Sequence, residues 1–321
     1  MKELLIARAN ECFDRYIDKY YQKGDFERAD FWDTAEIFEI IDDAYDITGD
    51  KKYADYIEET YTAFVNKHGQ LWEGNIYNDD IMWAIIAMAR AYKLTGIKKY
   101  YETAKANLDY VWPRALSDDL GGGLWWRIDN QTKNACVNCP GVIAACLIGE
   151  ISGDDSYFEK AKEVMEWTVK NLADEAIGKV YDAMNLKGEV NKWSSTYNQG
   201  TYIGGNMLLY FHYQDEVYKN RAAAAASFTM NEMYHGEVMD NEDWGNDVIG
   251  FKAILSRWIR LYALSENKPE YIEWLRKNAA AAYSHRNSEG IIMTKFATQT
   301  EEIYYDVFGT SAAVGVMFNC I

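Results

Sequence analysis

The chain has 321 residues, of which 49% are hydrophobic and 15% aromatic, and its formal net charge is −17. That length suits one large domain or two ordinary ones, and the apolar content supports a sizeable core and argues against intrinsic disorder. The negative charge argues against nucleic acid and anionic membrane surfaces as partners, because both need a basic face, and it favours a neutral substrate.

The N-terminal segment "MKELLIARANECFDRYIDKYY" is amphipathic and predicts a helix over residues 2–21. Charges interrupt it every few residues, so it lacks the apolar core of a signal peptide, and no later segment is predicted to span a membrane. We expect a cytoplasmic protein, or a secreted one if a leader has been removed. Five cysteines, an odd and scattered set, suit reduced thiols in the cytosol better than a disulfide framework.

A helix–turn–helix pattern recurs along the chain, which has only three prolines. In each copy an apolar helix ends at a turn, and a more charged helix follows. The turn markers lie 47 to 62 residues apart, at Gly49, Gly96, Gly153, Asp215 and Asn267, and a further step reaches the C-terminus near Asn319. Together with the N-terminal helix this makes six inner and six outer helices. The pattern predicts an all-α protein, an (α/α)6 barrel in a single domain over residues 1–321.

The segments that lead into the inner helices differ from the turns at the opposite ends. Each carries Trp, Tyr or Phe beside Asp, Asn, Gln or Lys, and the six segments are "RADFWDTAE", "LWEGNIYNDD", "DDLGGGLWWRIDNQTKN", "VNKWSSTYNQG", "MDNEDWGNDVIGFK" and "TKFATQTEEIYYDVFGT". Function tends to lie on loops that a rigid scaffold holds. Six such loops at one barrel mouth predict an aromatic-walled cleft that bears carboxylates, a composition typical of a carbohydrate site.

Asp79 and Asp80 stand side by side where the second inner helix begins, in "NDDIMWA". Neighbouring side chains at a helix start diverge by about 100°, so the two carboxyls can bracket a small gap. A retaining glycosidase needs its carboxyls about 5–5.5 Å apart, and close like charges drive the two pKa values apart. The alternative is that Asp79 only caps the helix and Asp80 is solvated, as is common for such pairs.

The motifs together resemble glycoside hydrolase family 76, the bacterial and fungal endo-α-1,6-mannanases. The resemblance covers nearly the whole chain, and its specificity comes from the order of "FWDTAEIFEIIDDAYDITGD", "NDDIMWA", "GGGLWWRIDNQTKNACVNCPG", "TYNQG" and "FKAILSRWIR". It implies retaining hydrolysis of α-1,6-linked mannose chains through a covalent intermediate, with Asp79 as nucleophile and Asp80 as acid/base. Asn78 and Met82 flank the pair differently from the more aromatic family pattern.

Further residues of these motifs are candidates for sugar binding. Trp125 and Trp126 are expected to wall the cleft, and hydroxyl contacts are expected from Asp33, Asn134, Tyr197, Asn198, Gln199, Asp247 and Lys252. Structural roles compete with these assignments: the two tryptophans in the barrel core, Gln199 as an internal hydrogen-bonding group, and Lys252 as a surface partner of Asp247.

Other classes of protein fit less well. Isoprenoid synthases need a DDxxD motif, and Trp83 stands where the third aspartate belongs. The single "CVNC" lacks a second ligand pair, so we expect two small helix residues there, no metal site and no cofactor. A transglycosidase and an inactive carbohydrate-binding (α/α)6 protein stay open as alternatives. We expect a monomer that acts on a neutral oligo- or polysaccharide and binds neither nucleic acid nor membrane.

Overall fold

The computed structural model describes residues 1–235, 237–245, 247–303 and 306–321. The chain forms two compact units, and each is described by itself. Unit 1 comprises Met1–Phe64, Ser195–Gly200 and Thr229–Ile321, and unit 2 comprises Val65–Ser194 and Thr201–Phe228. The described residues form twelve α-helices and only short strands, which confirms the prediction of an all-α chain. A single domain over residues 1–321 stays a prediction.

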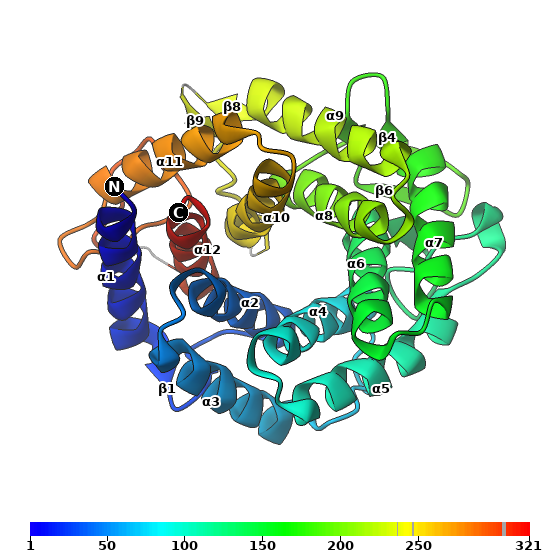
Figure 1. Cartoon of the computed structure of the whole chain (residues 1–321), viewed down its shortest axis with the longest axis horizontal. Helices are drawn as coiled ribbons and strands as arrows, with labels where there is room; N and C mark the ends of the chain where they lie inside the picture. The colour runs from blue at the N-terminus through cyan, green and yellow to red at the C-terminus, as the bar shows by residue number, and fades with distance from the viewer. Residues whose placement is uncertain (236, 246, 304–305) are drawn as a thin grey trace. The chain divides into compact units, whose positions relative to one another are not determined.

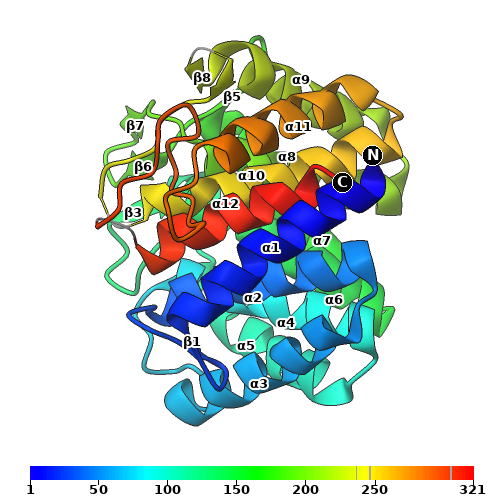
Figure 2. The same ribbon diagram turned by 90° about the vertical axis from the view of Figure 1, so that its left-hand side faces the viewer.

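Unit 1 is built around α12, in which every residue from Val307 to Asn319 is buried. A helix that is apolar all round belongs in a core. Helices α1, α2, α10 and α11 pack against α12 (Figures 1 and 2). The helices of this unit are α1 (Lys2–Tyr20), α2 (Phe31–Thr48), α10 (Phe251–Ser265), α11 (Pro269–Ser284), α12 (Val307–Asn319) and the 3₁₀ helix η2 (Val248–Gly250). Its antiparallel strand pairs are β1 (Tyr21–Gln22) with β2 (Asp25–Phe26), and β8 (Tyr234–His235) with β9 (Val238–Met239).

Unit 2 is organised around α6, which packs against α4, α5 and α7 (Figure 1). Its helices are α4 (Asn78–Thr95), α5 (Lys98–Ala115), η1 (Asp119–Gly121), α6 (Ala135–Ser152) and α7 (Ser156–Leu172). Helices α3 (Lys51–His68), α8 (Thr196–Tyr213) and α9 (Glu216–Glu232) contribute residues to both units. The strands are β3 (Thr132–Asn134), β6 (Ala183–Asn185) and β7 (Val190–Asn191) in one antiparallel sheet, and the pair β4 (Ala173–Asp174) and β5 (Lys179–Val180).

Helix α6 is also the one helix in the described ranges with the length and apolar composition to cross a membrane, but 78% of that stretch is buried inside the structure. Such burial is what the core helix of a helical unit shows.

The turns between paired helices lie at or within one residue of the positions predicted from the sequence. The three predicted glycine turns are confirmed, with φ angles of +66°, +72° and +69° at Gly49, Gly96 and Gly153. Left-handed backbone of this kind favours glycine and ends a helix. At the fourth turn Gln214 takes the positive φ, one residue before the predicted Asp215, and Asn267 takes it at the fifth. Helix α12 ends at Asn319, as predicted.

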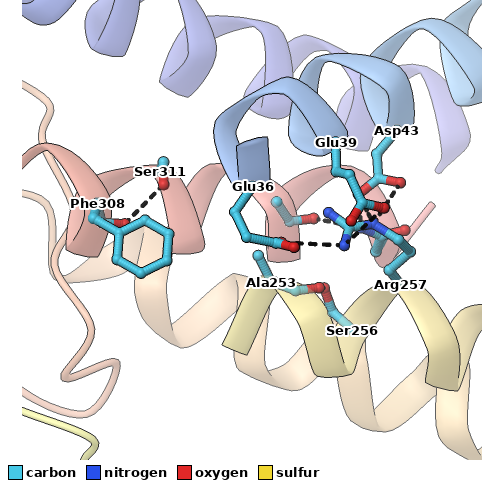
Figure 3. A network of polar contacts seen from close by, with 10 residues as sticks. Glu36, Glu39, Asp43, Ala253, Ser256, Arg257, Phe308 and Ser311 are labelled. Atoms are coloured by element: carbon cyan, nitrogen blue, oxygen red, sulfur yellow. Dashed lines mark hydrogen bonds and ion pairs between the residues drawn. The ribbon is translucent and has the colours of Figure 1, made fainter. Parts of the chain in front are cut away.

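A buried ionic cluster ties three helices of unit 1 together (Figure 3). Arg257 of α10 donates from Nε to both oxygens of Asp43, at 3.1 and 3.0 Å, and from Nη1 to Glu36 at 3.3 Å. Nη1 also lies 3.3 Å from Glu39, and Asn319 of α12 donates to Asp43 at 2.9 Å. Burial and the neighbouring Glu39 hold the pKa of the Glu36 carboxyl well above its usual range. The guanidinium offsets several carboxyls of α2 at once.

Replacing Arg257 with Met should therefore be strongly destabilising, because acidic groups stay buried after their cation is removed. We expect the free energy of unfolding to fall by about 3–5 kcal/mol, measured by denaturant unfolding at pH 7. The matched control is Arg221→Met, since the carboxylates of Glu166 and Glu175 that pair with Arg221 are about half exposed. There the loss should stay near 1 kcal/mol or less. Equal losses would contradict this account of the cluster.

Candidate functional site

The segment before α4 sets where that helix begins, and it orients the side chain of Asp80, the second aspartate of the pair. The helix begins at Asn78, so Asp79 and Asp80 are its second and third residues, where acidic side chains interact favourably with the helix dipole. Asn75 folds back over this turn: its Oδ1 accepts from the Tyr77 N–H at 2.9 Å, and its Nδ2 donates to Asp80 Oδ2 at 3.0 Å. Asp80 is half-buried and is oriented by a neutral amide.

Asp79 is buried, with 8% of its surface exposed. The indole Nε1–H of Trp126 donates to Asp79 Oδ2 at 2.9 Å. Burial raises the pKa of the Asp79 carboxyl to about 7, although hydrogen bonds from the Cys136 thiol and the Trp126 indole lower it. Asp79 Oδ1 has no hydrogen-bond partner among the described residues. The result is a carboxyl that changes charge near neutral pH and whose orientation an indole fixes.

Trp126 is held in place by backbone hydrogen bonds on both sides. Its N–H donates to the carbonyl of Thr132 in β3 at 2.9 Å, and its carbonyl accepts from the N–H of Asn78 at 2.8 Å. The Arg127 guanidinium lies 5.7 Å from the Trp126 ring, within cation–π range. Trp125, by contrast, is only 1% exposed and belongs to the core. Trp126 therefore lies at the aspartate pair, whereas the surroundings of Trp125 fit the competing structural role.

Asn134 ends β3 and caps α6 without a side-chain cap bond. Its carbonyl accepts from Asn138 Nδ2 at 2.8 Å, while within the described residues its buried Oδ1 has no hydrogen-bond partner. Two residues further on, Cys136 contacts Asp79. In unit 2, Asp79 and Asp80 thus lie in the first turn of α4 and Asn134 directly precedes α6, while Trp126 bonds to Asp79 from the loop before β3.

Asp33 and Asp247 lie in unit 1, in one acidic neighbourhood at the start of α2. Asp33 forms a capping box with Asp30, in which each side chain accepts from the other residue's N–H, at 3.2 and 3.4 Å. Burial, followed by the charge of Asp30, raises the pKa of Asp33 to about 8. Trp32 Nε1 donates to Asp247 Oδ1 at 3.2 Å. A sugar contact at Asp33 or Asp247 stays a prediction.

The other predicted binding residues of unit 1 at the start of α8 are deeply buried. Asn198 and Gln199 have no exposed surface, and the Tyr197 ring packs edge-on against Phe251 with centroids 4.4 Å apart. Asn198 Oδ1 accepts from the N–H of Ser195 at 2.9 Å, which anchors the first turn of α8. Through these contacts Tyr197 and Asn198 stabilise the packing around the start of α8. Sugar contacts by Tyr197, Asn198 and Gln199 stay predictions.

Lys252, at the start of α10, is also fully buried. Its ammonium donates to the carbonyl of Thr294 and lies 4.5 Å from the centroid of the Phe296 ring. Burial lowers the pKa of Lys252 to about 8, and the nearby Glu242 opposes that shift. Lys252 is therefore not a surface partner of Asp247. A direct sugar contact would require its buried amine to leave the Thr294 carbonyl and the Phe296 ring.

Sequence reasoning missed two residues next to these candidates. Cys136 was expected to be a small helix residue, but its thiol contacts Asp79, and the only signal was its place at the start of an inner helix. The buried Glu242 accepts from the N–H and hydroxyl of Thr196, at 2.7 and 2.5 Å, and so caps α8. Several acids share its segment, and nothing in the sequence distinguishes the buried one.

A metal-binding cluster is not found in the part of the chain that the structure describes: no group of three or more His, Cys, Asp or Glu lies within reach of one ion. The chemistry that these side chains offer is acid–base and nucleophilic, through carboxyls beside an indole.

The fold class is that of the (α/α)6 barrel glycoside hydrolases, as predicted. The structure aligns with the GH76A α-1,6-mannanase from Salegentibacter sp. HEL1_6 at a TM-score of 0.91, with 29% identity over 98% of both chains. It also aligns with the Lin0763 protein from Listeria innocua at a TM-score of 0.89, with 24% identity over 98% of this chain and 95% of that one.

The family model described as "Glycosyl hydrolase family 76" matches residues 6–320. The chain belongs to this family, which confirms the resemblance seen in the motifs. Among curated proteins it is similar to the mannan endo-1,6-alpha-mannosidases DCW1 of Candida albicans and Saccharomyces cerevisiae, with 26% identity over 247 residues and 27% over 232. These alignments cover 68% and 65% of this chain and 54% and 51% of the relatives, so the chain spans about half the length of the curated relatives that it matches.

The burial of Asp79 predicts a cost in stability. Its pKa is about 7 in the folded protein and close to 3.8 when exposed, so the folded state binds the proton more tightly. The stabilising contribution is present below pH 4 and is lost as the pH rises through 7. Asp79→Asn removes this dependence, so at pH 8 the variant should be more stable than the wild type by on the order of 2 kcal/mol. Unfolding curves at pH 4.5 and 8 measure it.

The matched control is Asp80→Asn, the same change at the next, half-buried position, which should gain less stability at pH 8. If Asp79→Asn keeps the pH dependence of the wild type, the Asp79 carboxyl is not the buried titrating group described above.

Proposed function

We propose that the chain hydrolyses α-1,6-linked mannose chains with retention of configuration, with Asp79 as nucleophile and Asp80 as acid/base. The observation that carries the proposal is the aspartate pair in the first turn of α4, where the buried Asp79 is oriented by Trp126 and the half-buried Asp80 by Asn75. Two carboxyls in different environments are what a two-step glycosidase needs.

The similar proteins support both the substrate and the pair. One solved structure, 28% identical with a TM-score of 0.92, is described as an inactive variant of the Salegentibacter α-1,6-mannanase in complex with α-1,6-mannotriose. Two consecutive aspartates are replaced by asparagine in that variant. The curated relatives are named mannan endo-1,6-alpha-mannosidases. A neutral mannose chain also suits a protein with a net charge of −17, because no anionic group has to approach it.

The reaction then proceeds in two displacements. The ionised Asp79 attacks the anomeric carbon, and the bond from that carbon to the leaving oxygen breaks while Asp80 gives its proton to that oxygen. Asp80 next removes a proton from water, which attacks the same carbon and releases Asp79 as a carboxylate. The Trp126 N–H holds one Asp79 oxygen, so attack comes from a fixed direction. Another sugar hydroxyl in place of water would give transglycosylation.

We expect the wild type to hydrolyse linear α-1,6-mannooligosaccharides, and we expect Asp79→Asn and Asp80→Asn each to lose at least about 10³-fold in kcat. The matched control is Asp155→Asn, since Asp154 and Asp155 form a similar pair at the start of α7 and the Asp155 side chain is 83% exposed. Product release is measured by chromatography, with folding checked by circular dichroism. Hydrolysis that persists in both variants would contradict the assignment of the pair, and binding without hydrolysis in the wild type would favour the inactive carbohydrate-binding alternative.

The pH dependence separates the roles of the two aspartates. A nucleophile must be ionised, so kcat/KM should fall as the pH drops below the Asp79 pKa of about 7. If kcat/KM instead falls as the pH rises through 7, Asp79 acts as the proton donor and the two roles are exchanged.

A further inference from the structure

Lys133 of β3 has no exposed surface, yet its partners are not carboxylates. Its Nζ donates to four backbone carbonyls of one loop, and the distances are 3.0, 2.7, 2.5 and 3.1 Å to the carbonyls of Ser117, Asp119, Gly122 and Gly123. It also lies 4.6 Å from the Trp125 ring and 5.6 Å from the Trp167 ring, measured to the centroids. Three ammonium protons are thus shared among four acceptors and two aromatic faces.

The loop that surrounds this ammonium has an unusual backbone. Four consecutive residues, Leu120 to Gly123, have positive φ angles of +58°, +81°, +118° and +83°. A Cβ on Gly123 would lie 2.5 Å from a carbon of the Trp167 ring, so glycine is required there for space as well as conformation. Carbonyl dipoles that converge on one point repel each other unless a cation lies between them. The conformation of residues 117–123 therefore depends on Lys133.

This loop leads directly into the residues that hold Asp79. Leu124 exchanges two hydrogen bonds with Asn138 of α6, and the N–H of Trp125 donates to the carbonyl of Ala115 at the end of α5. Trp126 then bonds to Thr132, the residue next to Lys133, and to Asp79. The segment from Leu124 to Trp126 is therefore held at both ends. The loop before it is bound by the Lys133 ammonium, and Trp126 is bound by Thr132 of the same strand as Lys133.

We propose that Lys133 is a positioning residue of the hydrolytic site, which acts by holding the loop 117–123 so that the Trp126 indole stays aligned with the Asp79 carboxyl. The inference rests on the proposed function for its effect on catalysis, but the alignment itself is measurable without activity. Lys133 does not touch the reacting atoms in this account, and its effect passes entirely through Trp126.

The test is Lys133→Met, which keeps a long unbranched side chain and removes the charge and the hydrogen bonds. With tryptophan labelled with ¹⁵N, and the Trp126 signal assigned from Trp126→Phe, the indole N–H should exchange with water at least about 10-fold faster in the variant. A misplacement of this kind should lower kcat/KM by about 10²-fold. Loss of the N–H donor raises the pKa of Asp79, so the acid limb of the kcat/KM profile should move to higher pH.

Two comparisons separate positioning from a loss of stability. In the Trp126→Phe background, Lys133→Met should lower kcat/KM by much less than it does in the wild type, because both changes break the same connection. Arg257→Met, which removes the buried cation that bonds to Asp43 and Glu36 in unit 1 and is expected to be strongly destabilising, should lower stability without changing the indole exchange or the pH profile.

An unchanged Trp126 exchange rate in Lys133→Met would overturn the proposal, as would an equal loss of kcat/KM in both backgrounds. If the wild type fails to cleave α-1,6-mannooligosaccharides while the exchange rate still rises in the variant, the alignment role is supported and the proposed function is refuted.

Discussion

The burial of one carboxyl, that of Asp79, is the constraint on which the site depends. Removing a carboxylate from water is costly unless hydrogen bonds or dipoles replace the solvent. Here the first turn of α4, the Trp126 indole and the Cys136 thiol supply part of that replacement, and the pKa stays raised to about 7 in spite of them. The group can therefore be ionised near neutral pH while it remains poorly solvated, which is the condition for a reactive carboxylate. Trp126, β3 and the loop 117–123 are arranged around this requirement.

Two of the buried cations, Arg257 and Lys133, serve different purposes. In unit 1, Arg257 compensates carboxyls of α2 and joins that helix to α10, while Asn319 of α12 bonds to one of the same carboxyls. In unit 2, Lys133 compensates backbone dipoles and shapes a loop. Buried ionic groups seldom add net stability over well-packed apolar residues. Their value here is geometric, because each cation fixes which segments lie together and how their side chains point.

Features that depend on a residue and its immediate neighbours in the chain, such as helix starts and turns, were predicted well from the sequence. Glycines mark three turns correctly, whereas Gln214 carries no such signal for a left-handed residue, and the predicted marker falls one position late. The aspartate pair was predicted to stand at a helix start, and it lies in the first turn of α4. Trp125 and Trp126 are neighbours in the chain with different surroundings: Trp125 is 1% exposed, whereas the Trp126 indole bonds to Asp79, and composition alone does not say which of the two rings faces the core.

What the sequence did not reveal is contacts between segments that are far apart in the chain. Cys136 lies 57 positions after Asp79, and Glu242 lies 46 positions after Thr196, so no local pattern announces either contact. Lys252 and Lys133 are charged residues in the interior. Their partners are backbone carbonyls and aromatic rings, which cannot be recognised from the sequence as partners of a buried cation. Such positions need a structure, because burial of a charge is decided by everything that surrounds it.

The central claim is that Asp79 forms a covalent bond to the sugar. A fluorosugar analogue of an α-1,6-mannoside with an activated leaving group would slow the second step more than the first and let the intermediate accumulate. The measurement is the mass of the intact protein, followed by the position of the sugar in the digested peptide. We expect one sugar, attached to Asp79. A sugar on Asp80 would exchange the two roles, and turnover of the analogue with inversion at the anomeric carbon would contradict the covalent mechanism.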